Sequence, residues 1–95
     1  MATDKEKMMS SANYYAGLVA SAKNDCADTF IRLSTPINEI ERYWKGESGA
    51  QMVQELWDVK NNIKKIYDRL ADLETQMKSQ AASILEAWPD DTEVM

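Results

Sequence analysis

The sequence predicts an all-α protein: an antiparallel helical hairpin that dimerises into a four-helix bundle. Two observations lead to this fold class. Two long segments of the 95 residues carry apolar residues at alternating spacings of four and three, which is the pattern of helices that pack along one seam. Between them, residues 44–49 hold two of the three glycines. A helix stop and a helix start this close together predict antiparallel neighbours.

The first predicted helix covers about residues 4–43. Thr3 and Glu6 form a capping-box pattern at its start, in which the Thr3 hydroxyl accepts from a first-turn amide. Thr29 is the least apolar position of the seam, and Phe30 beside it is the alternative. The seam runs at helical spacing through Met8, Ala12, Tyr15, Val19, Ala22, Cys26, Thr29, Leu33, Ile37, Ile40 and Trp44.

Pro36 interrupts this first helix. It has no amide hydrogen to donate to the carbonyl of Arg32, and its ring crowds the preceding turn. The apolar spacing nevertheless continues across it. We therefore expect a kink near Pro36 with the helix axis continuing, and Ser34 or Thr35 could cap the restarted segment.

The turn is predicted at residues 44–49. Gly46 can adopt the left-handed conformation that ends a helix without steric cost. Ser48 then begins the next helix, because its hydroxyl can accept from a first-turn amide while Gln51 reaches back to the Ser48 amide.

The second predicted helix covers about residues 50–88, and nothing inside it breaks a helix. Pro89 ends it, and residues 89–95 form an acidic tail. Its seam repeats the four-three spacing through Met52, Leu56, Val59, Ile63, Ile66, Leu70, Leu73, Met77, Ala81, Ile84 and Trp88.

A second, partial apolar stripe lies beside this seam and carries Val53, Trp57 and Tyr67. Two adjacent stripes predict two neighbours, the other arm of the hairpin and a second chain. We therefore place these three residues at a dimer interface, together with Tyr15 and Val19 of the first helix. The alternative is that Trp57 and Tyr67 widen the contact within one chain.

The composition argues against several classes of partner. The net charge is −5 with no histidine and no basic block, whereas nucleic-acid phosphates need clustered Lys and Arg. No apolar run approaches the roughly 20 residues of a membrane span, so no stable membrane insertion is expected. Helical periodicity also continues through the small residues 20–22, which argues against a cleavable signal peptide there.

No catalytic, cofactor or metal site is predicted. Histidine is absent, and the single cysteine, Cys26, lies on the seam, where it fits the role of a small buried apolar residue. Carboxylate-bridged metal sites of helical bundles use a Glu-x-x-His pair, which this chain cannot form. The glycines near the turn follow a helix and not a strand, so they do not form a phosphate-binding loop. We expect a non-enzymatic protein that acts through its surfaces.

The central residues resemble those of a known family. Trp44-Lys45-Gly46 lies in the middle of a chain of about a hundred residues, followed by 47–50, Val53 and Trp57-Asp58. This pattern is similar to the WXG family of ESAT-like proteins, small substrates of bacterial type VII secretion. The resemblance implies a hairpin that forms homodimers or heterodimers and is exported folded by a membrane ATPase. It also implies that Trp44 and Gly46 belong to the surface that the secretion machine reads. The alternative is that Trp44 only closes the end of the bundle.

The tail departs from that family. Many type VII substrates carry Tyr-x-x-x-Asp/Glu after the second helix, and this tail has no tyrosine. Trp88 followed by Asp91 and Glu93 is a possible divergent signal. Otherwise a partner chain supplies the signal, or this tail uses another sequence.

The expected function is therefore that of a secreted helical hairpin, made in the bacterial cytoplasm and exported by a type VII system. It would act as a substrate or effector, or as the escort of a co-secreted protein. Its expected partners are a second copy or a paralogous WXG-type chain, and the type VII secretion ATPase. The rival readings are a structural filament or needle-type subunit and a cytosolic coiled-coil adaptor.

Overall fold

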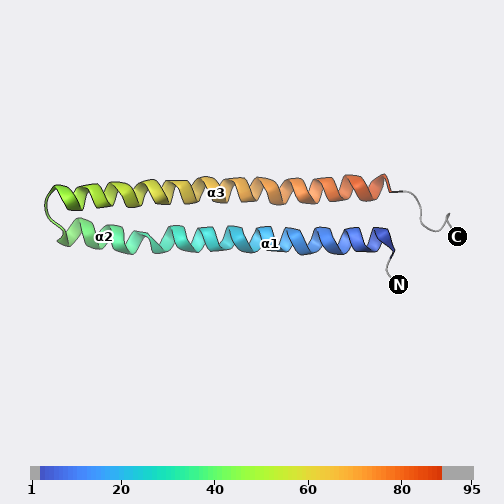
Figure 1. Cartoon of the computed structure of the whole chain (residues 1–95), viewed down its shortest axis with the longest axis horizontal. Coiled ribbons are helices and arrows are strands. Elements are labelled where there is room, and N and C mark those ends of the chain that lie inside the picture. Colours follow the sequence, from blue (N-terminus) through green and yellow to red (C-terminus); the bar gives the residue numbers. More distant parts are fainter. Residues whose placement is uncertain (1–2, 89–95) are drawn as a thin grey trace.

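The computed structural model describes residues 3–88, and these residues are helical with short connections and no strand. The elements in chain order are α1 (Asp4–Arg32), α2 (Ser34–Tyr43) and α3 (Glu47–Glu86). Figure 1 shows α1 and α2 nearly in line, with α3 returning beside both of them. The molecule measures 75 by 21 by 13 Å along its principal axes. The predicted all-helical hairpin is thus confirmed for a single chain.

The first arm starts and bends close to the predicted positions. The Thr3 hydroxyl accepts from the Glu6 amide at 3.1 Å, so α1 begins at Asp4 as expected. The arm is interrupted at Leu33, one turn before Pro36. Pro36 then occupies the first turn of α2, where an amide hydrogen is not required.

The predicted cap of the restarted segment is wrong. Leu33 is the N-cap of α2, and no side chain bonds to the first amides of that helix. The Ser34 hydroxyl instead accepts a hydrogen bond from Lys60 of α3. The Ser34 side chain therefore contacts the other arm, whereas the local sequence predicted that it would cap α2.

The connection between the arms is shorter than predicted and uses its glycine differently. The first arm ends at Trp44, whose backbone is extended (φ −92°, ψ 98°). Gly46 has a positive φ of 96° with a ψ of −173°, a region open almost only to glycine, and it is the N-cap of α3. The predicted Ser48 cap is wrong, because α3 begins at Glu47 and no side chain caps it.

The face of α3 that meets the first arm also differs from the prediction. The predicted seam positions that are half-buried are Leu56, Ile63, Leu70, Met77, Ala81 and Trp88. The other predicted positions are wrong by one residue. The exposed residues among the predicted seam positions are Met52, Val59, Ile66, Leu73 and Ile84. Their buried or half-buried neighbours in sequence are Val53, Lys60, Tyr67, Glu74 and Leu85.

On the first arm, Phe30 is half-buried and Thr29 is exposed, so the alternative seam position applies.

The buried residues of the described chain lie at one end of the hairpin. Ile37 and Ile40 of α2 and Gly49 and Lys60 of α3 are buried, whereas α1 contains no buried residue. We call α2 with residues 47–60 the closed end. Residues 4–22 with 75–86 form the open end, where the two helices shield each other only partly.

Candidate functional site

The turn displays an aromatic side chain at the tip of the molecule. Trp44 is 55% exposed, and its amide donates to the carbonyl of Ile40 at 2.9 Å, which fixes the backbone below it. Tyr43 beside it is also exposed, with the Arg42 guanidinium 5.9 Å from its ring. The predicted site residues Trp44 and Gly46 thus lie together at the tip, with the indole available to a partner.

Gly49 holds this turn in place, a role that the sequence analysis did not assign. Gly49 is buried, and a Cβ atom there would overlap the carbonyl oxygen of Trp44 and lie 2.9 Å from the Trp44 Cβ. Only glycine permits this approach between α3 and the end of α2. A groove of about 400 Å³ lies beside the contact, lined by Ile40, Trp44, Val53 and neighbouring residues.

Lys60 is a second feature that the sequence analysis missed. Its side chain is only 7% exposed, in the interior of the hairpin. The ammonium donates to the Ser34 hydroxyl at 2.7 Å and lies 4.4 Å from the centre of the Phe30 ring and 4.9 Å from that of Trp57. The rings supply the negative faces that a cation needs in place of a carboxylate. Lys60 therefore joins the arms in a seam where an apolar residue is usual.

The predicted interface residues on α3 have contacts within the chain. Tyr67 is half-buried, with the Lys23 ammonium 6.0 Å from its ring, and Val53 lines the groove beside the turn. Trp57 is exposed but shares Lys60 with Phe30. These contacts support the alternative in which Trp57 and Tyr67 widen the intrachain seam. Their membership of a dimer interface stays a prediction.

The predicted interface residues on α1 lie toward the open end. Val19 is half-buried and Tyr15 is exposed. Tyr15 lines a groove of about 270 Å³ between the arms, together with Met8, Met77 and Ile84. This groove is lined mostly by apolar surface and lies at the open end.

Cys26 lies in the middle of the molecule. It is half-buried with a free thiol, and it lines a mostly apolar groove of about 250 Å³ with Phe30, Ile63 and Tyr67. Its surroundings agree with the small apolar role expected of it.

One ion-pair network ties α1 to α3. Lys23 donates to one carboxylate oxygen of Glu74 at 2.8 Å, and Lys78 donates to the other at 3.2 Å. The hydrogen bond from Lys23, with that from Lys78, lowers the pKa of Glu74. The same bond to Glu74 raises the pKa of Lys23. Glu74 can therefore occupy a seam position while ionised.

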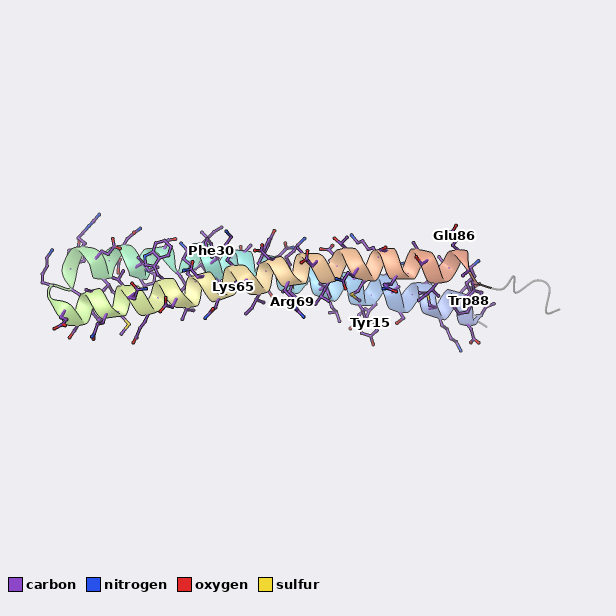
Figure 2. All side chains as sticks on the ribbon, turned by 90° about the horizontal axis from the view of Figure 1, so that it is seen from above. Tyr15, Phe30, Lys65, Arg69, Glu86 and Trp88 are labelled. Carbon is purple, nitrogen blue, oxygen red and sulfur yellow. The ribbon has the colours of Figure 1, made fainter. Side chains whose placement is uncertain are left out.

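The predicted tail signal is only partly within the described residues. α3 ends at Glu86, and Trp88 is half-buried just beyond it. Figure 2 shows Trp88 near the end of the hairpin where α3 ends. Asp91 and Glu93 lie outside the described residues.

The arrangement offers binding surfaces. Within residues 3–88, no three His, Cys, Asp or Glu side chains gather closely enough to hold a metal ion. None of α1, α2 and α3 combines the length and the apolar character that a membrane crossing requires. The surfaces available for binding are the exposed indole at the tip and the exposed apolar side chains along α3. Comparisons with protein-family models, curated proteins and solved structures find no match to this chain.

Proposed function

We propose that the chain is a non-enzymatic helical hairpin of the ESAT-like type, exported by a type VII secretion system as a homodimer or heterodimer. It acts as a secreted substrate or effector, or as the escort of a co-secreted protein. Its partners are a second copy or a paralogous hairpin, and the secretion ATPase. No cofactor takes part.

The observation that carries this proposal is the tip of the hairpin. Trp44 and Gly46 connect two arms, and the Trp44 indole remains 55% exposed above a backbone that Gly49 locks. A large aromatic side chain on a rigid turn is a good recognition anchor, because little conformational entropy is lost when a partner covers it.

The exposed apolar residues of α3 support the dimer. Ile66 is 52% exposed, and Met52, Val59 and Leu73 are also exposed at seven-residue spacing. Apolar residues repeated on one helix face usually pack against another helix. A second hairpin would supply that helix and complete a four-helix bundle.

The test replaces Trp44 by alanine and measures export in a bacterium that carries a type VII system. We expect Trp44→Ala to keep its helical circular dichroism and dimer mass but to lose export. Tyr43→Ala is the matched control, since Tyr43 is the neighbouring exposed aromatic residue, and it should be exported normally. Export of Trp44→Ala at the wild-type level would contradict the proposed role of the turn.

The mass of the purified protein tests the other half of the proposal. Light scattering at high protein concentration should give a sharp dimer, alone or with a paralogous hairpin. A series of larger assemblies would instead favour a filament subunit.

A further inference from the structure

A continuous stripe of exposed residues runs along α3, beside the face that meets the first arm. Each member immediately precedes a residue that is buried or half-buried in the intrachain seam. One residue turns a helix by about 100°, so this outer stripe lies at nearly a right angle to the first arm. Adjacent helices of a four-helix bundle meet at such an angle. The outer stripe consists of Met52, Glu55, Val59, Asn62, Ile66, Arg69, Leu73 and Gln76.

The outer stripe has a heptad pattern of its own. Its spacings alternate between three and four, and its apolar members alternate with polar ones. Glu55 and Arg69 lie two heptads apart, with Asn62 midway between them. Within residues 3–88, neither Glu55 nor Arg69 forms an ion pair. Figure 2 shows Arg69 on the same long edge of the hairpin as Tyr15, with Phe30 on the other edge.

We propose that the outer stripe binds the outer stripe of a second copy in antiparallel orientation, with the two-fold axis beside Asn62. This inference rests on the dimer of the proposed function and specifies its contact. At this register Glu55 of each copy faces Arg69 of the other, and the two Asn62 side chains face each other. An asparagine paired with itself in a helical seam favours one register, because the two amides can donate to and accept from each other only when they are level.

The same register also pairs the apolar members. Val59 lies within one residue of the level of Ile66 of the other copy, and Met52 lies within one residue of the level of Leu73 of the other copy. Because the axis is two-fold, each pairing occurs twice and all four exposed side chains of each copy are covered. The apolar and charged residues therefore favour the same alignment to within one residue.

Other alignments bring like charges together. A slide of one heptad in one direction brings Lys65 within one residue of the level of Lys65 of the other copy, and a slide in the other direction does the same for Asp58. A parallel pairing puts Glu55 opposite Glu55 and Arg69 opposite Arg69. Like charges facing each other across an interface are unfavourable, so they discriminate against these arrangements.

Cysteine cross-linking tests the axis. In a Cys26→Ser background, Asn62→Cys should form a disulfide-linked dimer under mild oxidation. Asn61→Cys is the matched control, since Asn61 is also exposed and points away from the outer stripe. It should cross-link at least tenfold more slowly.

Two further cysteine variants test the orientation. Glu55→Cys and Arg69→Cys should each cross-link poorly alone and efficiently when mixed, which only the antiparallel pairing allows. Efficient cross-linking of Glu55→Cys with itself would overturn the antiparallel orientation.

Charge reversal provides an independent measurement on the full-length protein. Arg69→Glu should weaken the dimer about tenfold, and the double variant Glu55→Arg/Arg69→Glu should restore the affinity. Circular dichroism should stay unchanged, because both side chains are exposed.

The outcomes separate this inference from the proposed function. A stable dimer that Arg69→Glu does not weaken, and in which Asn62→Cys does not cross-link, overturns the outer stripe and leaves the dimer standing. A wild-type protein that stays monomeric overturns both the homodimer and the proposed contact through the outer stripe. The export of Trp44→Ala tests the role of the turn and does not depend on this contact.

Discussion

The closed end and the open end of the hairpin contain the same two kinds of helix, yet only the closed end forms a core. All the buried residues of the described chain lie in α2 or in residues 49–60 of α3. At the open end, α1 contributes small residues such as Ala12 and Ala16 to the seam, and the groove beside Tyr15 stays open. A pair of helices shields one side of each apolar stripe, so burial has to be completed by a third element or by special local contacts.

The closed end has such contacts. Gly49 lets the start of α3 approach the Trp44 backbone, which brings Ile37 and Ile40 against α3. Lys60 then fills the next part of the seam with its long aliphatic stem and places its ammonium 4.4 Å from the centre of the Phe30 ring and 4.9 Å from that of Trp57. The difference between the ends indicates that the closed end has a core within one chain, while the helices of the open end shield each other less completely.

The largest effect is expected from truncating the core of the closed end. Ile37 is 2% exposed, so Ile37→Ala should lower the free energy of unfolding by about 2–4 kcal/mol. Ile31→Ala is the matched control, because Ile31 is 67% exposed, and its effect should stay within about 0.5 kcal/mol. Urea denaturation at equal protein concentration measures both. Equal losses would show that the core is not concentrated at the closed end.

Replacing the glycines by alanine should change the free energy of unfolding less, and in opposite directions at the two ends. Gly49→Ala should cost about 1–3 kcal/mol, because the added methyl group overlaps the Trp44 carbonyl and forces the turn to shift. Gly17→Ala should instead stabilise by about 0.5–1 kcal/mol, since nothing lies within 4 Å of a Cβ there and alanine is the better helix former. Thermal unfolding followed by circular dichroism gives both values. Stabilisation by Gly49→Ala would mean that the turn can relax.

The next effect concerns the cation inside the closed end. A double-mutant cycle of Lys60→Met and Phe30→Leu should give a coupling of about 0.5–2 kcal/mol, because the ammonium interacts with the Phe30 ring. The same cycle with Lys65→Met should give a coupling near zero, as Lys65 is exposed. A coupling energy at Lys60 no larger than that at Lys65 would show that Lys60 contributes through packing of its aliphatic stem and not through its charge.

Much of the architecture was predictable because its signals are local. The start of α1 follows from the Thr3 cap, the bend follows from Pro36, and the reversal follows from the glycines after Trp44. Each depends on residues within about one turn of the position that it determines. The identity of the inward face is different, because it depends on the other arm.

The inward face of α3 was predicted wrongly at alternate positions for a tertiary reason. Two rows of residues on α3 lie beside Leu56 and Ile63, one containing Val59 and Ile66 and the other containing Lys60 and Glu74. Apolar periodicity alone favours the row with Ile66 as the inward face, because that row is the more apolar. In the structure the row with Lys60 and Glu74 faces the first arm, because Ser34 there bonds to Lys60 and Lys23 there bonds to Glu74. The site at the tip was predictable as a turn, but the crowding of Gly49 against Trp44 required the three-dimensional contact.

The smallest effect is expected at the ion pair between the arms, and pH reveals it. Hydrogen bonding from Lys23 lowers the pKa of Glu74, so this group stabilises the folded chain above its unfolded-state pKa of about 4.3. That contribution is lost as the pH falls through the lower pKa of the folded state. Lys23 has its pKa raised, so its contribution is present below about 10.4 and is lost as the pH rises through its folded-state pKa.

The variant Glu74→Gln isolates this contribution, since glutamine resembles the protonated acid. Wild type should be the more stable protein near pH 7, and the two midpoints of urea denaturation should converge as the pH falls below about 4. The difference at neutral pH should also shrink in high salt, because both side chains are partly open to solvent. A difference that persists unchanged at acidic pH would assign the effect to packing of the Glu74 stem against α1, and the charge of Glu74 would then contribute nothing to joining the arms.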